Sequence, residues 1–465
     1  MSHFCPVYPE PRKKRTSMWK FFFNARRSWL DRLYERSYHM QMGEIHLPGV
    51  DLYMVNDPAM VKLVLQDNST DFPKSPLLGN ALRPLLGDSV FTTNGSTWQR
   101  QREMMEPAFA QARLKVAFPV MKQATEDMLK RLDRLPAGTQ QNIEVDMTFV
   151  TADIIFRTIF SQALKGEDAH RIFKAFSRFQ ASAPKLMLPA MFGMRWLVWP
   201  WDVWRSRNAA SEIRGLLEAR IRPRYEAHMR DGKGEGESGS TDILAAFMSA
   251  RDPKTSQPFS FNELVDQVAM LFLAGHETSA SALTWACYLL AIVPDVQERV
   301  HAEVTAQLQG RSLMQPDLKP MTLTWNVFRE ALRLFPPVGF IVREAAQKCP
   351  MRDKLVPKGA SILVSPWLIQ RHRLWWHEPD AFNPDRYDEE STRESLRQAY
   401  LPFGAGPRVC IGAAFAMQEA MVILSSLVAR YRLEVVPGHV PQPVGRLTIR
   451  SANGVSLKLY RRPLV

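Results

Sequence analysis

Apolar residues recur mostly at intervals of three and four positions, which is the period of an amphipathic helix. The pattern is clearest over residues 110–230, and the composition of residues 413–427 is also strongly helical. Shorter patterns typical of strands return at four places along the chain: residues 45–47, 52–55, 360–364 and 433–459. The chain is therefore predicted to be mainly α with a small β region.

The longest predicted helix begins at a capping-box signature, with Ser260 at the N-cap and Glu263 three residues later. Its apolar pattern continues to about Ile292, and Pro294 then stops it. A helix of about 30 residues is roughly 45–50 Å long at 1.5 Å per residue. Such a helix must cross most of the molecule.

The middle of this helix, residues 274–279, carries chemistry that a plain core helix does not need. Gly275 and Thr278 weaken a helix, and a threonine hydroxyl can bond back to the carbonyl four residues earlier and bend it. The bend opens a notch for a small ligand, and Glu277 beside Thr278 offers a carboxylate and a hydroxyl for proton delivery. The alternative is a glycine needed for close packing next to a surface acid. His276 is interpreted as structural or solvent-linked.

Composition sets broad limits on the protein class. The 465 residues are 46% hydrophobic and 23% charged, which is ordinary for a globular protein. Single cores stop growing near roughly 250–300 residues, so length alone favours two or more domains. No secretory signal or membrane-spanning apolar run stands at the N-terminus. The four cysteines are far apart in sequence, which excludes a CxxC site and favours reduced thiols in a cytosolic compartment: Cys5, Cys287, Cys349 and Cys410.

Cys410 differs from the other three cysteines because of the loop around it, residues 403–412. Two glycines and a proline before it predict a tight, irregular loop, and the helical composition that follows places the thiol at a helix N-terminus. The helix dipole and free backbone N–H groups there favour a thiolate. Gly406 and Gly412 would let the backbone approach a flat ligand, and Arg408 adds a positive charge. A buried core cysteine is the alternative.

Two further pairs of residues each share a helix face. Trp98 and Arg102 present an indole N–H and a guanidinium, which are both good donors to carboxylates. Plain packing with a solvated charge is the alternative for this pair. Glu330 and Arg333 place opposite charges at i and i+3, just before a Pro-Pro pair that ends their helix. Alone, the second pair is typical of a surface ion pair, worth about 0–1 kcal/mol.

The spacing Phe-x-x-Gly-x-Arg-x-Cys-x-Gly over residues 403–412 resembles the haem-binding loop of the cytochrome P450 superfamily. By that resemblance Cys410 is the axial ligand of the haem iron. Phe403 is expected to pack near the sulfur, and Arg408 is expected to meet a haem propionate. A thiolate ligand to haem iron pushes electron density that promotes O–O cleavage.

Three other motifs follow the family's order along the chain. Residues 274–279 resemble the oxygen-activation helix, which implies that Glu277 and Thr278 are catalytic and steer protons. Trp98 and Arg102 resemble the family's propionate-binding helix. The remaining matches are Arg343, as a further propionate ligand, and a buried cluster that holds the fold around the haem: Glu330, Arg333 and Arg386.

The resemblance implies one cytochrome P450 domain over residues 40–465, after a basic segment at 1–39, with haem b between the long central helix and the cysteine loop. This overrides the expectation of two domains. The implied protein is a soluble, bacterial-type haem-thiolate monooxygenase that hydroxylates, dealkylates or epoxidises a small hydrophobic substrate with O2 and two electrons. Two alternatives stay open: a peroxide-dependent peroxygenase or isomerase, and a haem sensor that is not an enzyme.

The walls of the substrate pocket are expected to be apolar, so an apolar substrate follows. By the resemblance they come from residues 73–90, from residues 338–341 and from one stretch of the long helix, which includes Met270, Phe272 and Ala274.

The net charge of +13 suggests an acidic partner rather than nucleic acid, because no nucleic-acid-binding module accompanies it. The chain ends too soon after Cys410 for a fused reductase, so the expected electron donor is a separate ferredoxin or flavodoxin with its NAD(P)H reductase. We expect a cytoplasmic monomer. Peripheral membrane contact stays open for residues 11–36 and 186–204, where aromatic residues gather, with core packing as the alternative.

Overall fold

The computed structural model describes residues 4–13, 28–47, 49–164, 166–191, 198–231 and 242–463. Helices make up most of it, as the sequence predicts. They are α2 (Pro58–Lys62), α3 (Pro76–Leu86), α4 (Gly95–Met105), α5 (Gln111–Leu132), α6 (Ile143–Phe160), α7 (Gly166–Met191), α8 (Pro200–Asp231), α9 (Ile243–Ser249), α10 (Phe261–Ile292), α11 (Pro294–Leu308), α12 (Thr322–Leu334), α13 (Pro366–Ile369), α14 (Arg393–Ala399) and α15 (Ala413–Arg430).

The strands are short, and most fall in the predicted stretches. They are β1 (Met42–Leu47), β2 (Val50–Val55), β3 (Gln140–Asn142), β4 (Ile341–Glu344), β5 (Cys349–Met351), β6 (Lys354–Val356), β7 (Ser361–Val364), β8 (Tyr431–Val435), β9 (Pro443–Gly445), β10 (Ile449–Ser451) and β11 (Ser456–Arg461). Of these, β3, β4, β5 and β6 lie outside the predicted stretches. Short 3₁₀ segments and one π-helical turn, Leu63–Asp67, connect them. The 3₁₀ segments are Leu30–Arg32, Glu35–Tyr38, Glu106–Phe109, Gln315–Leu318, Pro384–Tyr387, Glu390–Thr392 and Gly406–Arg408.

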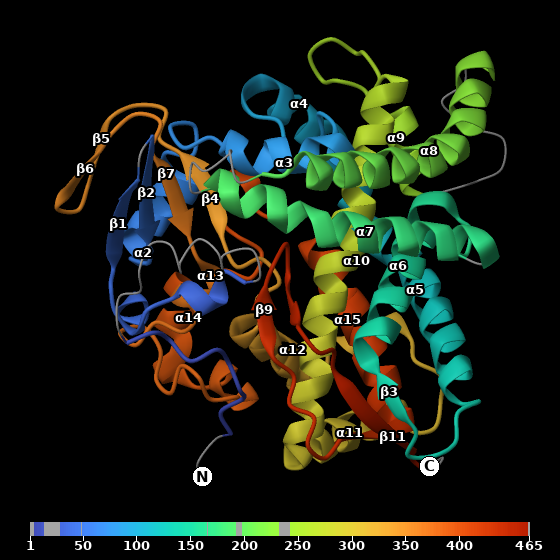
Figure 1. Ribbon diagram of the computed structural model, residues 1–465. Coiled ribbons are helices and arrows are strands. Elements are labelled where there is room, and N and C mark those ends of the chain that lie inside the picture. Colours follow the sequence, from blue (N-terminus) through green and yellow to red (C-terminus); the bar gives the residue numbers. More distant parts are fainter. Residues whose placement is uncertain are drawn as a thin grey trace.

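The largest sheet has the strand order β1-β2-β7-β4 and lies at one edge of the molecule (Figure 1). β1 and β2 form an antiparallel hairpin, whereas β2 and β7 pair in parallel, with Leu52 opposite Ser361. A parallel pair needs a long crossover, and here nearly the whole helical part of the chain lies between its two strands. A second sheet, β3-β11-β8, brings the end of the chain back against the start of α6.

Helix α10 crosses the middle of the molecule, with α7 and α8 lying across its upper half (Figure 1). It begins and ends where the sequence predicts, because Ser260 and Glu263 form the capping box and Pro294 opens the next helix. Almost all of its side chains are buried. A helix that is apolar on every side must be surrounded by protein, which explains why α10 is the axis of the fold.

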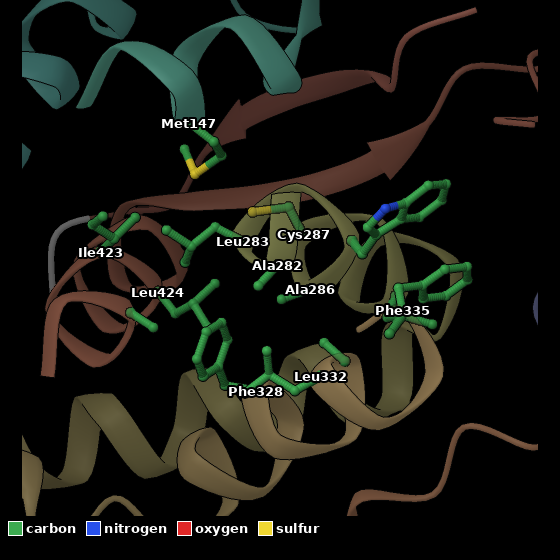
Figure 2. Packing of buried hydrophobic residues seen from close by; sticks show 14 of the residues in the cluster. Met147, Ala282, Leu283, Ala286, Cys287, Phe328, Leu332, Phe335, Ile423 and Leu424 are labelled. Atoms are coloured by element: carbon green, nitrogen blue, oxygen red, sulfur yellow. The ribbon is translucent and has the colours of Figure 1, made fainter. Parts of the chain in front are cut away.

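The second half of α10 packs between α6, α12 and α15, as Figure 2 shows. Burying a side chain such as Leu283 or Phe328 stabilises the fold by about 1.5–3 kcal/mol. The close-up labels the side chains that meet there: Met147, Ala282, Leu283, Ala286, Cys287, Phe328, Leu332, Phe335, Ile423 and Leu424.

Only part of the two segments with a suggested membrane contact is described. Of residues 11–36, positions 14–27 lie outside the described residues, whereas Trp29 and Leu30 are buried in the core. Of residues 186–204, positions 192–197 lie outside them. Three tryptophans at the start of α8 are more than half exposed: Trp199, Trp201 and Trp204.

Helix α15 is the one described helix that is long and apolar enough to cross a membrane by itself. About 61% of it is buried inside the protein. α10 and α11 reach the same threshold together, but they meet at an angle of 109°. Both candidate membrane spans are helices that contribute to the core shown in Figure 2.

Candidate active site

A cavity of about 860 Å³ lies between the middle of α10 and the loop before α15. Its apolar walls include Leu82, Val90 and Met270, and residues 338–341 also line it. Phe272, predicted as a wall residue, instead packs against other rings outside the cavity. All eight residues predicted to bind the cofactor or to transfer protons line the cavity: Trp98, Arg102, Glu277, Thr278, Arg343, Phe403, Arg408 and Cys410.

Cys410 lies just before the N-terminus of α15, as predicted, and its N–H donates to the carbonyl of Phe403 at 3.0 Å. Burial raises the pKa of the Cys410 thiol, while the backbone N–H of Gly412 and the charge of Arg102 act against it. Desolvation thus opposes the thiolate that the helix N-terminus favours, and the expected thiolate stays a prediction. A metal ion bound to the sulfur would lower the pKa of the Cys410 thiol and so favour the thiolate.

The two glycines of the cysteine loop have different roles. Gly406 has a φ of +71°, and a Cβ there would stand 2.0 Å from the carbonyl oxygen of Leu65. It is needed for packing against the π-helical turn, so the prediction that it approaches a ligand is wrong. Gly412 lines the cavity, and a Cβ there would meet no atom within 4 Å.

Three arginines lie near Trp98, and one of them, Arg102, is paired with Glu106 at 2.8 Å. The Arg408 guanidinium carbon lies 5.1 Å from the Trp98 ring, and Arg102 donates to the carbonyl of Val409 at 2.8 Å. The buried Nε atoms of Arg343 and Arg408 have no hydrogen-bond partner among the described residues. Burial lowers the pKa of Arg343 to about 10, and the charge of Arg408 adds to that shift.

Lys74 joins this group, although no sequence motif predicts it as a site residue. Its backbone pairs with that of Arg343, and its ammonium lies 5.7 Å from the Trp98 ring. It donates to the carbonyls of Val90 and Thr93 at 2.6 and 2.9 Å. No local motif marks this lysine, because its partners come from other segments. Its pKa is lowered to about 6 by burial and then by three cations: Arg408, Arg343 and Arg102.

These cations fit a flat ligand that carries carboxylates. Buried cations are costly unless they are paired with an opposite charge, and the acids that line the cavity, Glu44 and Glu277, are bonded elsewhere. Two carboxylates delivered by a ligand would supply the missing counter-charge. In the described part of the chain, no three His, Cys, Asp or Glu side chains converge to hold a metal ion.

The middle of α10 matches the predicted local chemistry. The Thr278 hydroxyl donates to the carbonyl of Ala274 at 2.8 Å, as expected. Gly275 serves packing as well, since a Cβ there would come within 3.0 Å of Ile155. His276 does not line the cavity. Its Nδ1 lies 2.5 Å from the carbonyl oxygen of Phe272, which agrees with a structural role.

Glu277 is held in a buried network that its neighbours in sequence do not reveal. Arg450 binds it in a bidentate manner, at 2.9 Å from Nε and 2.7 Å from Nη2. Thr448 donates to it at 2.7 Å, and Gln180 of α7 is a further donor. Burial raises the pKa of Glu277, but Arg450 outweighs burial and the pKa is lowered. Arg450 also pairs with Glu144 at 2.9 Å.

Glu330, Arg333 and Arg386 do not line the cavity but meet in a buried cluster, as predicted. Glu330 accepts from Arg333 at 2.8 Å and from Arg386 at 2.9 Å, and all three side chains are 0–3% exposed. Two more donors, the Tyr387 hydroxyl and the Asn383 N–H, complete the shell around the carboxylate. Burial raises the pKa of Glu330, but the two arginines overcome that effect and the pKa is lowered.

Comparisons with known proteins agree with this geometry. The cytochrome P450 family model matches residues 21–457. The chain is 30% identical to a cyclooctatin synthase of Streptomyces melanosporofaciens, over 88% of this chain and 87% of that protein. It is 32% identical to a cytokinin hydroxylase of Arabidopsis thaliana, over 87% of this chain and 78% of that protein.

A solved structure shows the same fold. The crystal structure of the cytochrome P450DA heme domain superposes with a TM-score of 0.79 at 24% identity, covering 91% of this chain and 90% of that one. A second Streptomyces melanosporofaciens protein, a cyclooctat-9-en-7-ol 5-monooxygenase, is 29% identical over 86% of this chain and 84% of its own. The chain therefore belongs to the cytochrome P450 family, as a monooxygenase whose cofactor is haem b.

Proposed function

We propose that this enzyme hydroxylates a small hydrophobic substrate, with Cys410 as the thiolate ligand of the haem iron. The observation that carries the proposal is the cavity itself. One cysteine on a helix N-terminus faces a threonine-bearing segment of α10 across about 860 Å³ lined largely by apolar side chains. When bound, haem supplies the dioxygen and one-electron chemistry, and a thiolate ligand favours O–O cleavage.

The cations beside Trp98 would hold the haem propionates. Arg343 and Arg408 each have a buried nitrogen without a partner among the residues described, and a carboxylate would satisfy it. Arg102 and Lys74 would add two further donors to the same group. Phe403 lies in the cavity wall beside the cysteine loop, where its ring would pack near the sulfur.

Proton delivery is assigned to Thr278 and Glu277. The Thr278 hydroxyl is at the cavity and gives its own proton to the Ala274 carbonyl, so its oxygen is left to accept from a water. Glu277 accepts two hydrogen bonds on each carboxylate oxygen. It can pass a proton only after one of these partners, Thr448 or Gln180, gives way to water.

The electron donor is proposed to be an acidic ferredoxin or flavodoxin with its NAD(P)H reductase. The net charge of +13 supports an acidic partner, because opposite charges steer association. The relatives' names, a cyclooctatin synthase and a cyclooctat-9-en-7-ol 5-monooxygenase, agree with an apolar substrate for hydroxylation. A cytoplasmic location and a monomeric state remain part of the proposal.

The test of the proposal is spectroscopic. Purified protein, reduced under carbon monoxide, should show the red-shifted Soret band of a thiolate-bound haem. Cys410→Ser should lose that band, while Cys349→Ser in β5 should keep it. Absence of the band in the parent protein, or its survival in Cys410→Ser, would refute the assignment of the ligand.

One rival keeps the haem but uses peroxide instead of reductase-supplied electrons. The four hydrogen bonds that occupy Glu277 favour it, because an acid that stays fully paired cannot relay protons. Turnover with hydrogen peroxide and none with any reductase system would establish the rival. Turnover with a ferredoxin system would dismiss it, together with the idea of a haem sensor without enzymatic activity.

A further inference from the structure

The turn between β9 and β10, residues 446–448, forms part of the cavity wall. The N–H of Ile449 donates to the carbonyl of Pro337 at 3.0 Å, and the Thr448 hydroxyl donates to Glu277 of α10 at 2.7 Å. Both contacts join the turn to the apolar wall that residues 338–341 and the middle of α10 form. The turn therefore faces the substrate space.

The backbone of this turn is tightly held. A Cβ at Gly445 would lie 2.3 Å from the Trp29 ring, so only glycine fits there. The Gly445 N–H donates to the Ser28 hydroxyl at 3.0 Å, and its carbonyl accepts from Trp29 at 3.2 Å. The N–H of Arg446 then closes the turn on the carbonyl of Thr448 at 3.1 Å. The backbone of Arg446 is therefore held in one position on the cavity wall.

The Arg446 side chain lacks a counter-charge in the part of the chain that the structure describes. It lines the cavity without a hydrogen bond or ion pair to any described side chain. The two acids that line the same cavity are already paired, Glu44 with Lys354 at 2.9 Å and Glu277 with Arg450 at 2.7 Å. Arg446 is exposed at this turn, and its guanidinium offers five N–H donors to an anionic group of a ligand in the cavity.

Arg446 is not among the cations that the structure gathers beside Trp98. The cations that would hold the propionates act on one another, since Arg102, Arg343 and Arg408 all lower the pKa of Lys74. The turn that carries Arg446 is held to α10 by the hydrogen bond from Thr448 to Glu277. No contact in the described structure links Arg446 to the cations that would hold the propionates, so its guanidinium is left for another anion.

We propose that Arg446 binds the carboxylate of an otherwise apolar substrate and so selects amphipathic acids over neutral analogues. The inference rests on the proposed function and names the substrate class for the same cavity. The planar guanidinium can bind a carboxylate through two parallel N–H donors. The apolar body would lie along the wall that includes Val90 and Met270, with the acid group fixed at the turn.

The experiment compares acids with neutral partners of the same shape. Dissociation constants are measured from the Soret shift, or by equilibrium dialysis where no shift occurs. The probes are dodecanoic acid against dodecan-1-ol, and abietic acid against its methyl ester. The parent enzyme should bind each acid roughly 10-fold or more tightly than its partner, as one charge-assisted pair implies. Arg446→Gln should remove that preference, and Arg446→Lys should retain part of it.

Arg432→Gln, on the exposed face of β8, is the matched control for loss of one positive charge and should leave the preference intact. Equal affinity of the parent enzyme for acid and neutral probe would overturn the inference, and so would failure to bind either acid. An unchanged acid preference in Arg446→Gln would do the same. The reduced carbon monoxide spectrum separates the two levels. If the red-shifted Soret band is present but the acid preference is missing, only the role of Arg446 is refuted. If the band itself is missing, the haem-thiolate assignment is refuted.

Discussion

Three buried carboxylates in the described structure differ in what neutralises them. Glu330 and Glu277 each have an arginine at bidentate distance, so burial does not keep them protonated. Among the described residues, no cation pairs with Glu419 of α15, and one of its oxygens has no hydrogen-bond partner. Burial raises the pKa of Glu419 to about 8, and a hydrogen bond from Ser279 only partly opposes it. The charge state of a buried acid therefore follows from its neighbours.

The Glu330 cluster should be essential for folding. Removing one partner of a buried ion pair typically costs about 3–5 kcal/mol, because the remaining charges stay buried without compensation. Glu330→Ala leaves both Arg333 and Arg386 in that state, so we expect little soluble protein and almost no bound haem. Haem content per chain and thermal unfolding measure this. Glu390→Ala, which removes a pair with about three-quarters exposed side chains, is the control and should change little. Normal haem loading of Glu330→Ala would contradict the prediction.

Arg450 should set the pH dependence of turnover through Glu277. In the parent enzyme the pKa of Glu277 is lowered, so the acid is ionised at neutral pH. In Arg450→Gln burial is opposed only by the smaller effects of His276 and Thr448, so the pKa rises and Glu277 becomes protonated as the pH is lowered. Product formed per NAD(P)H oxidised should then fall as pH decreases and recover as pH increases.

Glu144→Gln is the matched variant for this test. It removes the other carboxylate of Arg450 but keeps the Arg450–Glu277 pair, so its pH profile should stay like that of the parent enzyme. A pH profile of Arg450→Gln that matches the parent would mean that Arg450 only supports packing.

At the scale of elements, the sequence predicts what is encoded locally. Both ends of α10 follow from Ser260, Glu263 and Pro294, and the start of α15 follows from the loop around Cys410. The same holds for the short strands near residues 45–55. Contacts between distant segments carry no such local signal. Lys74, Arg450 and Glu419 were therefore missed, because their partners come from other elements.

The contact between α15 and α10 should make stability depend on pH. The folded-state pKa of Glu419 is raised from 4.5 to about 8. Between these two pKa values the folded chain keeps the Glu419 proton, whereas the unfolded chain releases it. The contribution of the neutral Glu419 to the free energy of unfolding is therefore fully present below pH 4.5. It is lost as pH rises through about 8.

Glu419→Gln stays neutral and should not show this loss. The stability of the variant relative to the parent should therefore increase with pH across that window, by up to about 1.4 kcal/mol per pH unit. Thermal unfolding over the range measures it. Gln418→Glu is not a suitable control for Glu419→Gln, because Gln418 donates a hydrogen bond to the carbonyl of Leu114 that the change would remove. Ser279→Ala is suitable, and it should steepen or preserve the slope rather than abolish it. Parallel curves for parent and Glu419→Gln would contradict the prediction.

At the scale of the whole molecule, the apolar core explains why length alone misleads. α10 supplies Leu264–Leu273 to one hydrophobic cluster and Ala280–Ala291 to another. Its polar segment, residues 275–279, lies between the two clusters, where the cavity opens. One helix thus joins two cores that could have been separate domains and leaves the reactive groups at their junction. The expectation of two domains failed because it counts residues and not shared elements.

A positive charge beside α15 should influence electron transfer from an acidic donor. Gln418 of α15 donates to the carbonyl of Leu114 in α5 at 2.8 Å, which places the exposed Lys115 beside the helix that Cys410 precedes. Lys115→Glu should slow the reduction of the haem by a ferredoxin at low salt. The difference from the parent should shrink at about 0.15 M salt, where screening acts over roughly 8 Å.

Lys348→Glu makes the same change of net charge at the residue before β5, a strand at the left edge of the molecule in Figure 1. Stopped-flow reduction under carbon monoxide compares the two variants. If the charge near α15 steers the donor, Lys115→Glu reduces the rate several-fold more than Lys348→Glu does. Equal effects would mean that net charge attracts the partner without directing it to this face. A rate independent of salt in the parent enzyme would exclude electrostatic docking altogether.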